Sequence, residues 1–287
     1  MGRVGGGVTA SVEWRLLRSG ASPEQRVKVA PLDAAHPLHP SAGSSPPAHG
    51  PLDAPEATIA RAAILRRHAY LRRLYGRWYR WIIARLPQAP GEVLEVGSGG
   101  GFLAEVLPGV ITSEVVAIPG VERVIDARRL PFADGSLRAV VATNVLHHVP
   151  EIGAFLGECE RCLAVGGRLI AIEPWPTAWS RFVYRRLHHE PFDERRDWSL
   201  PPGGPLTAAN GALPWIVLER DRAETARRFP RLRVASIEPC MPVTYLACGG
   251  IGRAWRLPGW CFDMLRLLER PFDRLGLFAL LVVERTR

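Results

Sequence analysis

The chain is 287 residues long and basic, with 37 lysines and arginines against 28 acidic residues and a formal net charge of +9. This length accommodates one large α/β domain with an appended cap, and an apolar share of 47% allows a sizeable core. No uninterrupted apolar run reaches the roughly 18 to 20 residues that a membrane-spanning helix needs, and the glycine-rich start lacks the apolar region of a signal peptide. We therefore expect a cytoplasmic protein.

The positive charge raises the question of a polyanionic partner, because clustered cations bind nucleic acids and anionic lipid surfaces. Lys28 is the only lysine, however, and Arg, Ala, Gly and Pro are abundant, which indicates the residue bias of a GC-rich genome. No basic module of known docking geometry is visible. Nucleic acid is therefore not expected as a partner, whereas peripheral membrane contact and the oligomeric state are left open by the sequence.

Five cysteines include one C-x-x-C pair, Cys159 and Cys162, a spacing that occurs in redox and zinc sites. A zinc site would need a second pair at similar spacing, and none follows. The pair also falls near the end of an expected helix, where the helix dipole disfavours a thiolate. We interpret these cysteines as reduced thiols.

Two different segments precede the first expected strand. Residues 1–55 are dense in Gly, Pro, Ala and Ser without a sustained apolar period, and we expect them to form a flexible leader. Residues 56–88 are expected to form an N-terminal helix that Pro87 ends. Its apolar side chains recur mostly at spacings of three and four, as a single stripe requires: Ile64, Leu71, Leu74, Tyr75, Trp78, Ile82 and Leu86.

Short apolar runs then alternate with helical stretches, a pattern typical of βα units and a mostly parallel sheet. The clearest strands are residues 93–96, 139–143, 168–173 and 277–284, and residues 151–163 are predicted to form a helix. We expect residues 56–287 to form one α/β domain.

The strongest functional signal is a glycine-rich turn between the first of these strands and a helix. Glycines let the backbone turn sharply and approach a ligand, and the helix start offers N–H groups that lack partners within the helix. A dinucleotide fingerprint G-x-G-x-x-G from Gly97 would need glycine at position 102, where the sequence has Phe102. The spacing acid-x-G-x-G-x-G instead fits Glu95, Gly97, Gly99 and Gly101.

This spacing resembles the first motif of the class I S-adenosylmethionine-dependent methyltransferases. Segments that are similar to later motifs of that family follow in the right order, at residues 111–114, 125–132, 144–149 and 163–169. The family includes the ubiquinone and menaquinone C-methyltransferases and many small-molecule O- and N-methyltransferases. The resemblance implies an α/β fold with a Rossmann-like, seven-stranded mixed sheet and flanking helices, and S-adenosylmethionine as the cofactor.

The resemblance also implies a set of cofactor contacts. Glu95 would help to hold the methionine amino group through the glycine loop, and Glu114, whose carboxylate has two oxygens, would accept both ribose hydroxyls. Asp126 and the backbone beside it would recognise the edge of the adenine. The implied cofactor-binding residues are Glu95, Gly97, Ser98, Gly99, Gly101, Glu114, Val115, Asp126, Ala127 and Asn144.

Three departures from the family pattern affect the adenine side of this site. Glu114 stands where aspartate is usual, and Leu137-Arg138 replaces the Phe-Asp often seen before the fourth strand. The segment between Glu114 and Asp126 is too short for the usual helix plus strand. We expect a loop containing Pro119-Gly120 there instead.

Methyl transfer from a sulfonium is an in-line displacement that depends mainly on positioning and on excluding water. A base is optional, and histidine is the natural candidate. His147 follows a strand at the carboxyl edge, where open α/β sheets bind ligands, and His188 and His189 lie in residues 174–222, an aromatic-rich segment that we expect to form a cap over the acceptor. These three histidines are the predicted catalytic residues, whereas His148 is expected to have a structural role.

Glu190 and Asp193 lie close to His188 and His189, and such a set occurs both in metal sites and in acid–base sites. Adjacent histidines on a helix point in different directions. No metal site is therefore predicted.

The sequence thus predicts an S-adenosylmethionine-dependent methyltransferase that acts on a small-molecule or lipid-like acceptor. One alternative is a non-catalytic S-adenosylmethionine-binding or membrane-surface protein with the same fold. A nucleotide-dependent oxidoreductase is less favoured because of Phe102. The acceptor itself, and whether oxygen, nitrogen or carbon receives the methyl group, do not follow from the fold.

Overall fold

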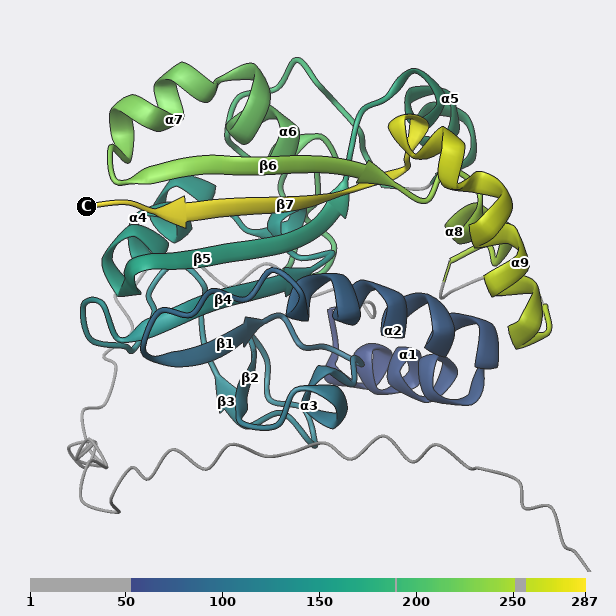
Figure 1. Ribbon diagram of the computed structural model, residues 1–287, viewed down its shortest axis with the longest axis horizontal. Helices are drawn as coiled ribbons and strands as arrows, with labels where there is room; N and C mark the ends of the chain where they lie inside the picture. Colours follow the sequence, from purple (N-terminus) through teal and green to yellow (C-terminus); the bar gives the residue numbers. More distant parts are fainter. Residues whose placement is uncertain (1–52, 189, 251–256) are drawn as a thin grey trace, which may run out of the picture. The chain divides into compact units, whose positions relative to one another are not determined.

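The computed structural model describes residues 53–188, 190–250 and 257–287 (Figure 1). Most of the expected leader, residues 1–52, and the predicted catalytic His189 lie outside these ranges. Within the described part of the chain, no helix has both the length and the apolar character that crossing a membrane requires.

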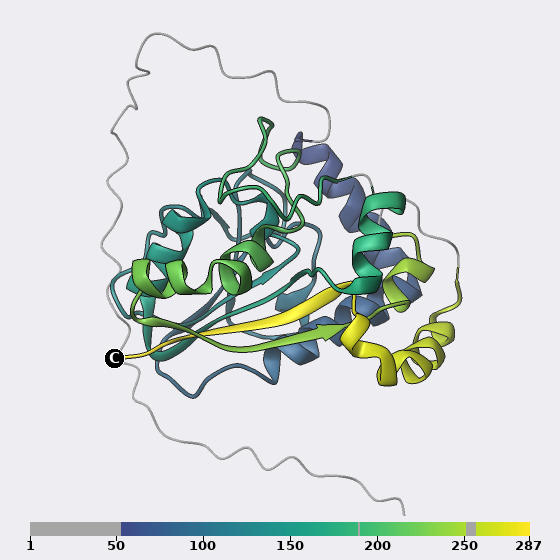
Figure 2. The ribbon, with the colours of Figure 1, turned by 90° about the horizontal axis from the view of Figure 1, so that it is seen from above.

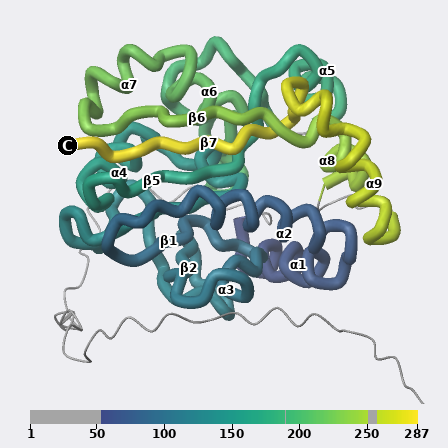
Figure 3. The backbone as a smooth tube through the Cα atoms, in the orientation of Figure 1, coloured from purple at the N-terminus to yellow at the C-terminus, as the bar shows by residue number. Residues whose placement is uncertain are grey.

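Seven strands form one mixed sheet, in the order β3-β2-β1-β4-β5-β7-β6. The first five strands run parallel, and β7 runs antiparallel to both β5 and β6. Figure 3 shows β7 between these two strands. The predicted seven-stranded mixed sheet is therefore confirmed. The strands are β1 (Glu92–Val96), β2 (Val110–Glu114), β3 (Arg123–Val124), β4 (Leu137–Thr143), β5 (Leu163–Pro174), β6 (Leu232–Cys240) and β7 (Phe278–Arg285).

Helices cover both faces of the sheet (Figure 2). Successive side chains of a strand point to opposite faces, so Leu94 packs into one apolar core with residues of α4, and its neighbour Val93 packs into the other with residues of α2. The helices are α1 (Pro55–Arg67), α2 (Ala69–Ile83), α3 (Leu103–Val106), α4 (Ile152–Cys162), α5 (Ala178–Leu187), α6 (Leu213–Trp215), α7 (Arg222–Arg228), α8 (Thr244–Ala247) and α9 (Gly259–Glu269), with two 3-10 helices, η2 (Leu146–His148) and η4 (Arg270–Leu275), and one π-helical turn, η3 (Ile216–Arg220).

The N-terminal helical segment consists of two helices, and the prediction of one continuous helix was wrong. His68 separates α1 from α2 with an extended backbone (φ −93°, ψ 106°). Ile64, which we placed on the apolar stripe, is exposed, and Leu65 is buried instead, so the two helices bury differently placed faces. The break lets α1 lie against the glycine loop, where a Cβ added at Gly100 would stand 2.5 Å from the Ala62 Cα.

Strand β6 has no counterpart among the predicted strands. Its pairing with β7 shifts register between Val234 and Ser236. Such an irregularity interrupts the two-residue alternation of apolar and polar side chains by which a strand is recognised in a sequence.

The loop expected after the second strand is present. Residues 115–122 contain no helix, and the only regular element before Asp126 is the two-residue strand β3. The C-x-x-C pair lies in α4 as expected, both cysteines are buried and free, and burial raises the pKa of the Cys162 thiol to about 11.

Trp78 of α2 should be a main contributor to stability, because its ring has no exposed surface and packs on Tyr245 and Phe278. Trp78→Ala is expected to lower the free energy of unfolding by about 3 to 5 kcal/mol, as for other buried aromatic residues. Trp260→Ala on α9, where the side chain is 64% exposed, is the matched control and should change it by no more than about 0.5 kcal/mol. Urea denaturation followed by circular dichroism measures both, and equal effects would contradict the assignment.

Candidate functional site

The glycine loop joins β1 to α3 and is enclosed by other elements at nearly every position. A Cβ at Gly97 would stand 2.5 Å from the Val145 side chain, and one at Gly101 would stand 2.5 Å from the Tyr79 hydroxyl. Gly99 differs, since its backbone is in the left-handed region (φ +49°) and no atom would lie closer than 3.8 Å to its Cβ. Gly99 is therefore the position at which the loop backbone meets open space.

The Glu114 carboxylate, at the end of β2, lies beside Gly99. Its Oε2 accepts a hydrogen bond from the Gly99 amide at 3.0 Å, and its Oε1 accepts one from the Val115 amide at 2.8 Å. Burial raises the pKa of Glu114, and these two hydrogen bonds oppose that rise. The two oxygens of a carboxylate can accept about four hydrogen bonds in all, so each Glu114 oxygen can accept one more.

Glu95 and Asp126 differ in their surroundings. Glu95 is buried beneath the loop, and burial raises its pKa to about 7, with a hydrogen bond from Ser98 opposing the rise and the charge of Glu114 adding to it. Asp126 instead receives hydrogen bonds from the Arg128 side chain, which lower its pKa. Near neutral pH, Asp126 is a fixed anion and Glu95 titrates.

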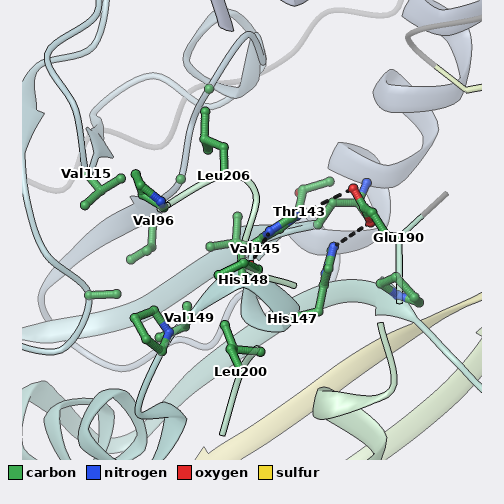
Figure 4. Close-up of a pocket in the computed structure, with 18 of the residues that line it drawn as sticks. Val96, Val115, Thr143, Val145, His147, His148, Val149, Glu190, Leu200 and Leu206 are labelled. Carbon is green, nitrogen blue, oxygen red and sulfur yellow. Dashed lines mark hydrogen bonds and ion pairs between the residues drawn. The ribbon is translucent and has the colours of Figure 1, made fainter. Parts of the chain in front are cut away.

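One cavity of about 2080 Å³ collects the predicted site residues. Ligand pockets usually measure about 300 to 1,000 Å³, so this cavity has room for a cofactor and a second molecule. Figure 4 shows part of its wall. All of the predicted cofactor-binding residues line it, together with His147 and His188: Glu95, Gly97, Ser98, Gly99, Gly101, Glu114, Val115, Asp126, Ala127 and Asn144.

Part of the expected cap lies at the wall. Residues 197–206 line the cavity, but Trp175 is buried in the core and Trp215 packs against that core.

Four further residues at the wall were not predicted as site residues. The aromatic side chains at the wall include four tyrosines, from α2, α5 and α8: Tyr75, Tyr79, Tyr184 and Tyr245. Tyr75 already belonged to the apolar stripe of the expected N-terminal helix, and that stripe was the available signal.

His147 is held between two carboxylates. Its Nδ1 lies 2.7 Å from Glu173 Oε2, and its Nε2 lies 3.5 Å from Glu190 Oε2. Burial by itself lowers the pKa of His147, but the hydrogen bonds to Glu173 and Glu190 outweigh burial and raise the pKa to about 9. Glu173 was not predicted as a site residue, although it ends a predicted strand at the ligand-binding edge.

His148 and His188 have different partners. His148 Nδ1 lies 3.1 Å from the Ala208 carbonyl oxygen, and burial together with the charge of His147 lowers the pKa of His148 to about 4. His188 follows the last residue of α5 with an extended backbone, and its Nδ1 accepts a hydrogen bond from the Glu190 amide at 3.2 Å. The expectation that His188 sits on a helix was therefore wrong, because α5 ends at Leu187.

In a comparison with known proteins, residues 94–171, from β1 into β5, match a family described as a methyltransferase domain. The ubiquinone/menaquinone biosynthesis C-methyltransferase of Desulfotalea psychrophila is 29% identical over 121 residues, which cover 36% of this chain and 49% of that protein. The ubiquinone biosynthesis O-methyltransferase of Thiobacillus denitrificans is 30% identical over 108 residues, covering 31% and 46%.

The chain thus spans about half the length of these two curated relatives. The ubiquinone biosynthesis O-methyltransferase of Xanthomonas axonopodis pv. citri is 27% identical over 186 residues, covering 52% of this chain and 76% of that protein. A solved geranyl diphosphate C-methyltransferase from Streptomyces coelicolor has a TM-score of 0.47 and 16% identity, covering 84% of this chain and 86% of that one; a likeness this distant adds no argument. Residues 94–171 match the methyltransferase domain family, and the predicted resemblance to the class I S-adenosylmethionine-dependent methyltransferases is confirmed.

Proposed function

We propose that the protein transfers a methyl group from S-adenosylmethionine to a small-molecule or lipid-like acceptor. The observation that carries this proposal is that the glycine loop and Glu114 open into the same large cavity as His147 and the expected cap. Cofactor and acceptor would then share one enclosed space, as a direct displacement requires.

The residues at the wall fit the cofactor. The backbone of residues 97–101, with Glu95 below it, would hold the methionine end, and the two oxygens of Glu114 would take the ribose hydroxyls. Asp126 and Ala127 would contact the adenine. When bound, the cofactor supplies an electrophilic methyl group on a sulfonium, and the chain's own contribution is to orient the acceptor and exclude water.

The acceptor is proposed to lie among the tyrosines and the cap. The names of the relatives concern ubiquinone and menaquinone biosynthesis, which favours an acceptor with an aromatic ring and apolar substituents. The α9 helix exposes Trp260, Leu267 and Leu268, and this apolar surface favours peripheral contact with a membrane that could supply such an acceptor. A cytoplasmic location is proposed with it.

Of the predicted catalytic histidines, His147 is proposed to position the acceptor. A group that keeps its proton up to a pH of about 9 is already protonated at neutral pH and is therefore not available as a general base. His188 lines the cavity and is proposed to contact the acceptor, and the proposal for His189 rests on the sequence alone. The oxidoreductase alternative gains no support, because the Phe102 ring packs edge-on against Tyr79 where that fingerprint needs glycine.

The first prediction concerns ligand choice. The protein is expected to bind S-adenosylhomocysteine and not NAD, because the loop has the spacing acid-x-G-x-G-x-G and carries Phe102 where the dinucleotide fingerprint needs glycine. Isothermal titration calorimetry measures both affinities. Heat from NAD with none from S-adenosylhomocysteine would overturn the proposed function.

A second prediction tests the open position in the loop. Gly99→Val should abolish S-adenosylhomocysteine binding, because a branched side chain would project where the backbone meets the ligand. Gly135→Val is the matched control, since Gly135 also has a positive φ (+66°) and open surroundings but does not line the cavity. Native circular dichroism for both variants with unchanged affinity for Gly99→Val would show that the ligand does not approach this loop.

A third prediction concerns the ribose contact. Glu114→Ala should weaken S-adenosylhomocysteine binding by about 1.5 to 3 kcal/mol, the range for hydrogen bonds to a charged group. Glu105→Ala on α3, where the carboxylate is exposed, is the control and should leave calorimetric affinity unchanged. Equal dissociation constants for the two variants would place the ribose elsewhere.

A further inference from the structure

His147, His148 and Glu190 converge on one point of the cavity wall. The ligand atoms of the three side chains all lie within 4.8 Å of one another. Glu190 Oε2 is 3.5 Å from His147 Nε2, and Glu190 Oε1 is 4.0 Å from His148 Nε2. Figure 4 shows both rings turned toward the Glu190 carboxylate. Ligand atoms around a tetrahedral zinc ion are roughly 3.3 Å apart, given bond lengths of about 2.0 to 2.1 Å, so small movements suffice to close this set.

Hydrogen bonds on the far side of each ring determine which nitrogen faces Glu190 with a lone pair. A carbonyl oxygen only accepts, so the contact with Ala208 assigns the Nδ1 of His148 as the donor. Glu173 Oε1 accepts from the amides of residues 145 and 146, and its Oε2 accepts from His147 Nδ1. Metal-binding histidines are oriented in this way, by a carboxylate or a carbonyl oxygen on the other ring nitrogen.

The assignment of the His148 proton to Nδ1 leaves the Nε2 of its neutral ring as an acceptor on the side of Glu190, 4.0 Å from Oε1. A neutral imidazole nitrogen and a carboxylate oxygen are both ligands that zinc takes in proteins.

No metal was predicted because adjacent histidines on a helix point in different directions, but His147 and His148 do not lie on an α-helix. The two histidines lie in the 3-10 turn η2, with ring centroids 4.2 Å apart and ring planes at 43°. They therefore stand side by side, whereas adjacent histidines of an α-helix diverge. His147 and Glu173 are buried, and Glu190 reaches the same point from the segment after α5.

We propose that His147, His148 and Glu190 bind a divalent transition-metal ion of the zinc type. Two imidazole nitrogens and one carboxylate are the protein ligands of many catalytic zinc and non-haem iron sites, which keep open coordination positions. Here these positions face the cavity. Metal binding displaces the proton that His147 holds between its two carboxylates.

The open positions suit an oxygen of the acceptor, a step that rests on the proposed function. A phenol or enol bound there through its hydroxyl would release its proton to water, and the metal would supply the charge that makes this loss possible near neutral pH, as it does for zinc-bound water. The oxygen would then form the new bond to the methyl carbon of the cofactor, while the carbon–sulfur bond would break and leave its electron pair on sulfur.

The experiment is a Co²⁺ titration of the full-length protein after chelator treatment, followed by visible absorption. One equivalent should bind with d–d bands of four- or five-coordinate Co²⁺, and Zn²⁺ should displace it. His148→Ala and Glu190→Gln should weaken binding at least about 10-fold. His68→Ala, which removes a histidine between α1 and α2 outside the cavity, is the matched control and should titrate like the parent protein.

Glu173→Gln gives a sharper test, because it alters no ligand. The glutamine oxygen can still accept the two backbone amides, but its NH₂ then faces His147 Nδ1 and requires that nitrogen to accept. The proton moves to Nε2, and metal affinity should fall by about 10- to 100-fold with native circular dichroism.

The outcomes separate this proposal from the proposed function. Absence of Co²⁺ binding, or equal binding by the parent protein and the His148→Ala, Glu190→Gln and Glu173→Gln variants, overturns the metal site. S-adenosylhomocysteine calorimetry on the same samples is the independent readout. Cofactor binding without metal binding refutes only the metal site, and metal binding without cofactor binding refutes only the proposed function.

Discussion

A single buried carboxylate, that of Glu173, connects the sheet to the acceptor side of the cavity. It stands at the end of β5 with no exposed surface, and it accepts hydrogen bonds from two backbone amides of the turn after β4 and from His147. A buried charge is costly unless hydrogen bonds surround it. The three contacts therefore form together, and they fix the turn η2 and the directions of the two histidine rings.

The same turn also shapes the cofactor side. The Val145 amide donates a hydrogen bond to Glu173, and the Val145 side chain fills the space beside Gly97. Ala62 and Tyr79 enclose the loop at Gly100 and Gly101 in the same way, so Gly99 is the one glycine of residues 97–101 with open space where a side chain would stand. The cofactor side and the acceptor side of the site share this turn, so a displacement of Glu173 would change the positions of residues on both sides.

Patterns within short stretches of sequence predicted the parts of the site that a single short stretch forms. The glycine loop and Glu114 could be placed because each depends on a strand end and a fixed spacing, and the resemblance supplied the order. The Tyr79 hydroxyl binds the Phe102 amide, and His147 binds Glu173; these pairs join residues far apart in the chain. No spacing within the sequence encodes them, and only the assembled sheet and helices bring them together.

The sequence identified the histidines as candidates, but their surroundings in the fold determine the pKa of each ring. An imidazole has an ordinary pKa near 6.5, yet burial between carboxylates raises the pKa of His147 to about 9, and burial beside His147 lowers the pKa of His148 to about 4. Two neighbouring histidines of one turn thus differ in protonation near neutral pH, His147 being charged and His148 neutral. The carboxylates of Glu173 and Glu190 on either side of His147 compensate its charge, so the protonated ring adds no net positive charge to this point of the cavity wall.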